Sequence, residues 1–235
     1  MPGFIVHMTA ASVFLDSLPE EHKLREKTAE NAFLVGNLAP DSVTNKFYSH
    51  FRDEETLDRI VQHPNLYRFL DRYGDLGEDP GVQGYFFHLY VDYRFFTEYI
   101  PRILRCYDEE GKTTWKTAKI KEAEVLKTGE KIPVTMFFSD EYYYGDYTKM
   151  NTWLVEKYHL TTGLDTEIKN PGITEVDYKD VKNVLALLES FLGMPAGAAD
   201  HLKVFQKEEI EAYIREISDY KAVKLFMDEI QGKKS

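Results

Sequence analysis

Cysteine is almost absent from this sequence of 235 residues, which contains Cys106 and no other. A single cysteine excludes an intrachain disulfide and a cluster of thiolate metal ligands. Long hydrophobic runs are missing as well, because no stretch approaches the ~18 apolar residues of a membrane-spanning helix. The first residues, Met1 to His7, lack the basic region and the long apolar region of a signal peptide, so we expect a cytoplasmic protein.

Basic residues are outnumbered by acidic ones, with 29 Lys and Arg against 40 Asp and Glu, and the formal net charge is -11. This balance argues against nucleic acid as a partner and against a stable association with anionic membranes, since both rely on basic surface. Bound divalent cations would offset part of the negative charge. Aromatic residues are abundant, with 16 Tyr and 15 Phe, and the 43% of hydrophobic residues is enough for a sizeable core.

The most informative stretch runs from Gly84 to Ile100. Its apolar side chains cover every side of a helical wheel, which is typical of a buried central helix. His88 and Asp92 are the ionisable exceptions, and their spacing places them on the same face of the helix. A buried carboxylate is unfavourable unless it is paired or binds a cation. Two interpretations follow: a buried His–Asp hydrogen bond that stabilises the core, or a pair of metal ligands of the type that zinc prefers.

The periodicity and the capping pattern of the chain predict a mainly α fold. Gly36 is expected to end the second helix, and Pro101 to kink the end of the central one. Asp53, Asp146 and Asp177 are expected at helix N-termini. The predicted helices span residues 4–18, 20–35, 53–62, 65–73, 82–106, 147–159 and 178–192, with one or two more over 206–230.

Residues 108–137 differ in character from the rest of the chain. Two segments, 113–120 and 131–138, flank the pair Thr128-Gly129, which predicts a small β-hairpin inserted into an α domain. A charged, irregular excursion is the alternative. We therefore expect a single α-helical domain over residues 1–235 with an insertion at about 108–140.

Three further residues of metal-ligand type lie in apolar or rigid settings. His7 is on the core-facing side of the first predicted helix. Asp41 follows Pro40, whose ring fixes the backbone and gives the carboxylate a rigid mount. His50 lies in a short irregular segment. Singly, these residues have ordinary explanations as a core histidine, a turn or helix cap, and a surface loop residue.

The order of these residues along the chain forms a pattern. An early histidine is followed by the turn Gly36-Asn-Leu-Ala-Pro-Asp41, the pair His50-Phe51 and the series His88-x-x-x-Asp92. The pattern resembles the bacterial zinc-dependent phospholipase C family, whose all-α fold is shared with the fungal single-strand nucleases. The resemblance covers roughly residues 3–100 and implies a multi-helix domain of that type.

By this resemblance, the metal ligands are His7, Asp41, His50, His88 and Asp92. Asp92 would bridge two metal ions. A metal-activated water would attack the phosphorus of a phosphodiester or phosphomonoester, with Asp41 and Asp92 as the catalytic residues. Asp41 would also orient or deprotonate this water. Arg52 is a candidate for binding the substrate phosphate, and a surface ion pair is its alternative role.

The sequence departs from the family in its ligand set. The secreted phospholipases use their processed N-terminal residue as a ligand, whereas six residues precede His7 here. They also have a histidine soon after the His-x-x-x-Asp series, whereas the next one here is His159. Glu98 lies about 80° round the helix from His88 and fits poorly on a straight helix. Other residues considered for completing the site, each with a simple alternative as a cap or loop residue, are Asp140, Asp146, His159 and His201.

We therefore expect one or two divalent metal ions, zinc with manganese or iron as alternatives, and a small phosphorylated substrate. The resulting hypothesis is a metal-dependent hydrolase that acts on phosphoester bonds. The alternative, motivated by the incomplete ligand set, is a catalytically silent relative that binds a metal or another ligand on the same scaffold. Hydrolysis of single-stranded nucleic acid is disfavoured by the negative charge.

Overall fold

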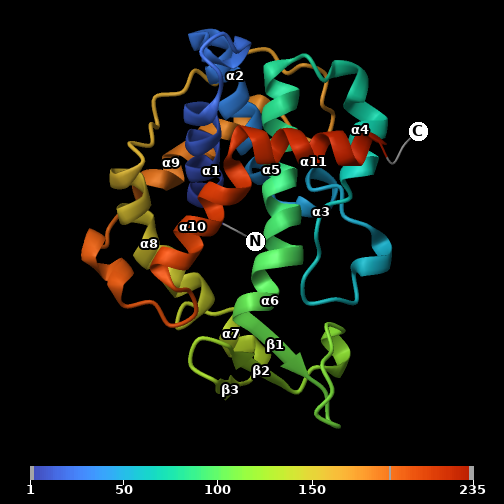
Figure 1. Ribbon diagram of the computed structural model, residues 1–235, viewed down its shortest axis with the longest axis vertical. Coiled ribbons are helices and arrows are strands. Elements are labelled where there is room, and N and C mark those ends of the chain that lie inside the picture. The colour runs from blue at the N-terminus through green and yellow to red at the C-terminus, as the bar shows by residue number, and fades with distance from the viewer. Residues whose placement is uncertain (1–2, 191, 233–235) are drawn as a thin grey trace.

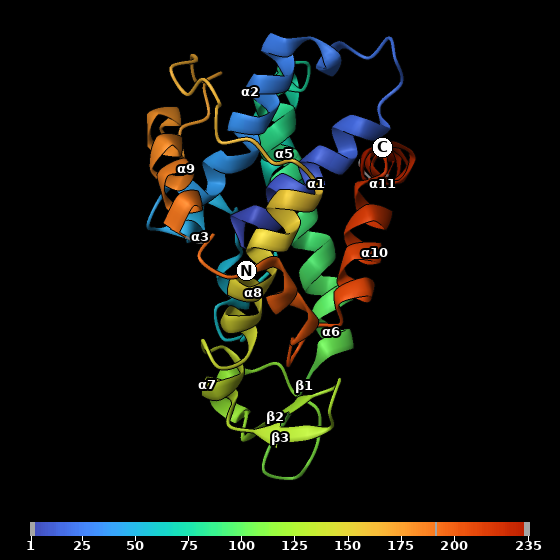
Figure 2. The same cartoon turned by 90° about the vertical axis from the view of Figure 1, so that its left-hand side faces the viewer.

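The structure is a computed structural model that describes residues 3–190 and 192–232. It is mainly helical, as expected, and carries one small antiparallel sheet. The helices stand around a central one, and the sheet lies at one end of the long axis (Figures 1 and 2). The ends of the expected 1–235 domain, at 1–2 and 233–235, lie outside the described residues, as does residue 191 of the predicted helix 178–192.

The central helix is α5, Pro80–Arg94, and its side chains are buried over most of its length. The Asp79 carboxylate caps it by accepting hydrogen bonds from the backbone N–H groups of Gly81 and Val82. The prediction of one helix over 82–106 is only partly correct. A π-helical turn, Phe95–Tyr99, and the short helix α6, Ile100–Ile103, follow α5, and the chain then becomes a strand.

Seven helices of eight residues or more surround α5 in the described part of the chain. Helix α2 packs against α5, α10 packs against α1 and α5, and α11 crosses in front of α5 (Figure 1). The bounds of these helices are α1 Phe4–Ser17, α2 Lys27–Leu38, α4 Leu66–Tyr73, α8 Tyr143–Lys157, α9 Val181–Ser190, α10 Lys207–Ser218 and α11 Tyr220–Gly232.

The prediction that Gly36 ends the second helix is wrong. Helix α2 begins at Lys27, after a 3-10 turn at Lys23–Arg25, and continues through Gly36 to Leu38. A Cβ atom at Gly36 would lie 2.0 Å from the carbonyl oxygen of Gly81. The glycine is therefore required by the close approach of α2 to α5, and not by a helix stop.

The sheet has the strand order β1-β2-β3, with β1 Leu104–Tyr107, β2 Glu122–Val125 and β3 Glu130–Ile132. The predicted hairpin is confirmed at its turn, where Gly129 joins β2 to β3 with a φ of 72°. Its expected flanks are wrong. Residues 113–120 form a loop with a 3-10 turn, and Val134–Phe137 is the short helix α7.

Two other predictions fail for reasons of tertiary contact. Residues 53–62 contain only the 3-10 turn Glu54–Thr56, and their backbone pairs with the loop around Lys116. Asp146 lies inside α8 and does not cap a helix. The predicted helix 65–73 is confirmed and capped by Asn65, and residues 206–230 form the two helices α10 and α11.

The described helices include none that combines the length and the apolar character needed to cross a bilayer.

Candidate metal centre

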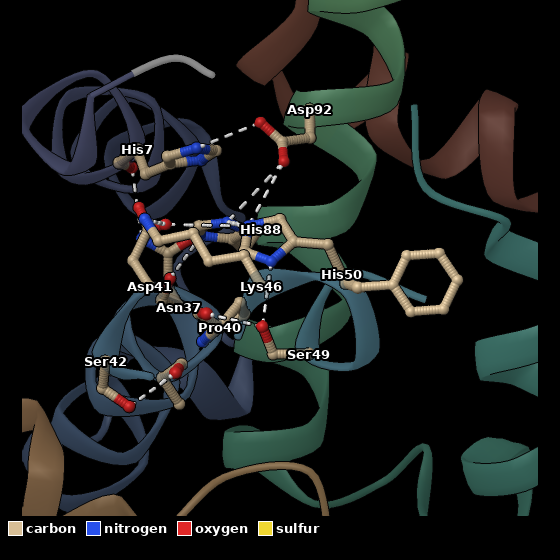
Figure 3. A network of polar contacts seen from close by, with 12 residues as sticks. His7, Asn37, Pro40, Asp41, Ser42, Lys46, Ser49, His50, His88 and Asp92 are labelled. Atoms are coloured by element: carbon tan, nitrogen blue, oxygen red, sulfur yellow. Dashed lines mark hydrogen bonds and ion pairs between the residues drawn. The ribbon is translucent and has the colours of Figure 1, made fainter. Parts of the chain in front are cut away.

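Five side chains of metal-ligand type converge beside α5 (Figure 3). His7 comes from α1, and Asp41 from the 3-10 turn η2, Ala39–Ser42. His50 follows the short helix α3, Lys46–Ser49, and His88 and Asp92 lie one turn apart on α5. The three histidines and Asp92 are fully buried, and the Asp41 side chain is 5% exposed.

A proline, a helix cap and a tyrosine hydrogen bond position these ligands. Pro40 lies in the first turn of η2, where its fixed φ suits the backbone that leads to Asp41. Asn45 caps α3 by accepting a hydrogen bond from the backbone N–H of Phe47. Tyr85, on α5, donates its hydroxyl to the carbonyl oxygen of Ser49 at 2.6 Å. The segment that ends in His50 is thereby attached to α5, the helix that carries His88 and Asp92.

The donor atoms are spaced as ligands of a common cation would be. Asp92 Oδ1 lies 3.4 Å from His7 Nε2, and Asp92 Oδ2 lies 3.5 Å from His50 Nε2 and 3.9 Å from His88 Nε2. His50 Nε2 is 3.6 Å from Asp41 Oδ1. Around one tetrahedral zinc ion, nitrogen and oxygen ligands lie roughly 3.3–3.6 Å apart. In two triads, His7–His88–Asp92 and Asp41–His50–His88, the donor atoms all lie within 4.8 Å of one another, close enough for a bound cation to draw them together.

Neighbouring groups fix the proton positions on two of the imidazoles. His88 Nδ1 lies 2.8 Å from the carbonyl oxygen of Asn37, which can only accept, so Nδ1 carries the proton. The Ser49 hydroxyl donates to the carbonyl oxygen of Pro40 at 2.9 Å. Its oxygen therefore accepts from His50 Nδ1, 3.0 Å away. Both histidines then present an unprotonated Nε2, as metal-bound histidines do.

These two Nε2 atoms lie only 3.2 Å apart. Burial lowers the pKa of His50 to about 4 and moves the pKa of His88 well below its usual value, so neither ring is protonated at neutral pH. Two lone pairs consequently face each other in a buried site. A cation bound to both nitrogens would turn this repulsion into attraction.

The Asp92 carboxylate is a second indication, after the facing Nε2 atoms of His50 and His88, that a cation can bind at this site. Neither of its carboxylate oxygens, nor either ring nitrogen of His7, has a hydrogen-bond partner within the part of the chain that the structure describes. Burial would raise the pKa of Asp92, but His7, His50 and His88 together lower it to about 2. A buried, ionised carboxylate without hydrogen bonds is unfavourable unless a cation is bound to it. These residues can therefore hold a metal ion.

Asp41 stands between this cluster and a cavity. Its Oδ1 accepts a hydrogen bond from Lys46 Nζ at 2.5 Å. Burial acts to raise the pKa of Asp41, but His88, Lys46 and His50 hold it well below the usual range. Asp41 and Lys46 line a cavity of about 490 Å³, which also borders α8 and α9. Lys46, Asn37 and Ser49 were not singled out in the sequence, because each looks like an ordinary helix or turn residue there.

The remaining predicted residues lie outside the two triads. Arg52 is half-buried and lines a small surface pocket with Arg68 and Glu175, not the cavity at Asp41. Burial lowers the pKa of Arg52, while Asp92 and Asp41 act in the opposite direction.

None of the residues considered for completing the site joins either triad of the described chain. Glu98 pairs with Arg94 and accepts a hydrogen bond from Tyr213. The buried Asp146 carboxylate binds the backbone N–H groups of residues 203–205. His159 and His201 are exposed, and Asp140 is exposed at the cavity wall.

A scan with protein-family models found no match to this chain, and searches of curated proteins and of solved structures found none either. The case for a function therefore rests on the geometry of the cluster itself.

Proposed function

We propose that this chain is a metal-dependent phosphoester hydrolase whose fold and site are of the zinc-dependent phospholipase C type. The observation that carries the proposal is the pair of facing Nε2 lone pairs of His50 and His88 beside the unpartnered carboxylate of Asp92. Imidazole and carboxylate donors favour zinc, with manganese or iron as alternatives. One or two ions fit, since the two oxygens of Asp92 face His7 on one side and His50 on the other.

A metal ion at this position would lower the pKa of a bound water and neutralise charge that develops on a phosphoryl group. The chain's own residues supply the rest. Asp92 would bridge two ions and keep them close together. Asp41 lies where the cluster meets the cavity, so its carboxylate can orient the attacking water and accept its proton. The expected contact of Arg52 with the phosphate stays a prediction, since Arg52 lines a separate pocket.

The cavity suggests a small substrate. Its volume of about 490 Å³ is within the usual range of small-molecule pockets, which is roughly 300–1,000 Å³. A small phosphorylated compound would fit with its phosphoryl group at Asp41. The net charge of -11 continues to argue against nucleic acid as the substrate.

The direct test measures metal content and hydrolysis together. Protein purified without chelator should contain near-stoichiometric zinc, manganese or iron and hydrolyse 4-nitrophenyl phosphate or bis(4-nitrophenyl) phosphate. Asp41→Asn should lower kcat by about 100-fold or more while the His7–His88–Asp92 triad keeps its metal, since a general base contributes about 10²–10⁴-fold. His63→Ala, a histidine outside both triads, is the matched control. Metal-loaded protein that hydrolyses no member of a phosphoester panel would contradict the proposal.

A second candidate function is a catalytically silent metal-binding protein on the same scaffold. The contact between Lys46 and Asp41 favours it, because the Lys46 ammonium is already hydrogen-bonded to the carboxylate that would accept the proton of the attacking water. This candidate predicts tight, stoichiometric metal binding without hydrolysis. The same pair of measurements therefore separates the two functions.

A further inference from the structure

We propose that Lys46 is the phosphate anchor of the cavity above the metal centre, and that it makes the site selective for dianionic phosphomonoesters over monoanionic phosphodiesters. The inference rests on the proposed hydrolase function for its selectivity and on the cavity alone for its anion binding.

The position of Lys46 is unusual for a lysine. It is the first residue of α3, four residues before His50, and its side chain is only 33% exposed. Its Nζ lies against Asp41 at the cavity wall (Figure 3). An ammonium group has three N–H donors, and Asp41 is the single hydrogen-bond partner of the Lys46 ammonium within the described chain. Two donors therefore remain for a ligand in the cavity.

The charge of the cavity makes a cation necessary for an anionic ligand. Among the described residues that line it, the ionisable ones besides tyrosine are Asp41, Asp140 and Lys46. The two carboxylates and the net charge of -11 repel a phosphate that approaches from solvent. Among the described residues of this wall, Lys46 is the one with a cationic side chain. Its ammonium can bind a phosphoryl oxygen in a charge-assisted hydrogen bond.

Occupation of the metal centre would strengthen this role. In the proposed function Asp41 is a metal ligand, so its negative charge would be shared with the ion and its hold on Lys46 would weaken. The ammonium then adds one positive charge beyond the metal. A phosphomonoester gains more from this charge than a diester, because its second ionisation has a pKa of about 6 and it is largely a dianion at neutral pH.

The rest of the wall suits a compact organic group. Phe4, Tyr144 and Leu187 line the cavity, so an apolar or aromatic substituent can lie against them. The substrate class is therefore a phosphomonoester of a small alcohol or phenol. In the reaction, water forms a new bond to phosphorus and the P–O bond to the alcohol breaks. One proton of the water goes to the leaving alcohol, and the other stays on hydrogen phosphate.

The test combines a binding measurement with a comparison of two substrates. Inorganic phosphate is titrated calorimetrically into metal-loaded wild type, Lys46→Met, Lys46→Arg and the control Lys116→Met, whose lysine pairs with Asp58 at the surface. Metal content is measured for each protein. We expect Lys46→Met to weaken phosphate binding by about 10- to 100-fold, the effect of one hydrogen bond to a charged group. Lys46→Arg should be intermediate, and Lys116→Met should equal the wild type.

The same proteins are then assayed with 4-nitrophenyl phosphate and bis(4-nitrophenyl) phosphate. The wild type should prefer the monoester in kcat/KM, and Lys46→Met should lower this preference about tenfold or more. Equal phosphate affinity in wild type and Lys46→Met, no phosphate binding by the wild type, or an unchanged preference would overturn the inference. If no protein hydrolyses either ester but phosphate affinity depends on Lys46, the hydrolase proposal fails and Lys46 stands as an anion-binding residue.

Discussion

Gly84 on α5 lies directly against the backbone of Phe33 on α2: a Cβ atom at Gly84 would be 1.9 Å from the Phe33 carbonyl oxygen. The contact is backbone to backbone, so no side-chain movement can make room. It also brings the Asn37 carbonyl within hydrogen-bond distance of His88, one turn further along α5. The glycine contacts between α2 and α5 therefore position a candidate metal ligand.

We predict that Gly84→Ala lowers the free energy of unfolding by about 1–3 kcal/mol or more, since α2 and α5 must separate to accept the methyl group. Thermal denaturation monitored by circular dichroism measures the change. Gly74→Ala is the matched control, because nothing lies within 4 Å of a Cβ at that position and its φ is -60°. Equal midpoints for the two variants would show that the close approach does not constrain the fold.

The two triads predict different losses of metal. His88 belongs to both of them, whereas His7 belongs to one. His88→Ala should therefore remove nearly all bound metal, and His7→Ala should leave the Asp41–His50–His88 side occupied. Elemental analysis of each purified variant measures the content. Identical metal content in His88→Ala and wild type would exclude this cluster as the binding site.

Chelation should also destabilise the folded protein. A metal that binds only the native state stabilises it by about 2.7 kcal/mol at a free concentration of 100 times Kd. Dialysis against EDTA should accordingly lower Tm, and added zinc should restore it. The His88→Ala variant is the control, since its Tm should not respond to EDTA.

Asp146 is expected to be one of the most important polar residues for stability. Its carboxylate accepts hydrogen bonds from the backbone N–H groups of Lys203, Val204 and Phe205 at 3.0, 2.7 and 3.2 Å. Asp146→Ala leaves these donors unpaired and should cost about 3 kcal/mol or more. Hydrogen exchange should accelerate at Val204 and Phe205 in particular. Glu156→Ala, an exposed position on the same helix, should leave both measurements unchanged.

Buried tyrosines predict a loss of stability in alkali. Burial raises the pKa of Tyr90 to about 12, although Arg94 acts in the opposite direction, and burial raises the pKa of Tyr143 further. Tyrosine in the unfolded chain ionises near pH 10. Above that pH the unfolded state binds fewer protons than the native state, so stability falls as pH rises from about 10 to about 12.

Urea denaturation at a series of alkaline pH values measures this fall. Tyr90→Phe should be less stable at neutral pH, because it loses the hydrogen bond to the Ile217 carbonyl, but its stability should depend less steeply on pH. The same dependence of stability on pH in Tyr90→Phe and wild type between about pH 10 and 12 would contradict the prediction.

The ligand-type residues could be identified from the sequence, because an ionisable side chain in an apolar or rigid setting is recognisable without knowledge of the fold. His88 and Asp92 stand out inside an apolar helix, and Asp41 stands out after Pro40. The groups that orient them have no such signal. Asn37 acts through its backbone carbonyl and Ser49 through one hydroxyl, and both roles exist only once α2, α3 and α5 are in contact.

The failures in the fold have the same origin. A glycine such as Gly36 suits a helix end and a tight helix contact equally well, and the partner that decides between them, Gly81, is distant in sequence. Residues 53–62 have a helical pattern in the sequence, yet Arg59 forms a β-bridge with Lys116, and the backbone on either side of Arg59 also hydrogen-bonds to that distant loop. Asp146 looks like a helix cap in the sequence. The loop that it binds lies 57 residues later, so nothing near Asp146 in the sequence indicates this contact.

The π-helical turn Phe95–Tyr99 has a consequence for the far end of the molecule. A π turn contains one more residue than an α turn, so every later residue is rotated by about 100° from its place on an uninterrupted helix. The extra residue therefore sets the direction, around the axis of α5, in which the chain leaves the helices and enters β1. Chain length in this one turn thus governs the orientation of the sheet, while the ligands upstream keep their own helical phase.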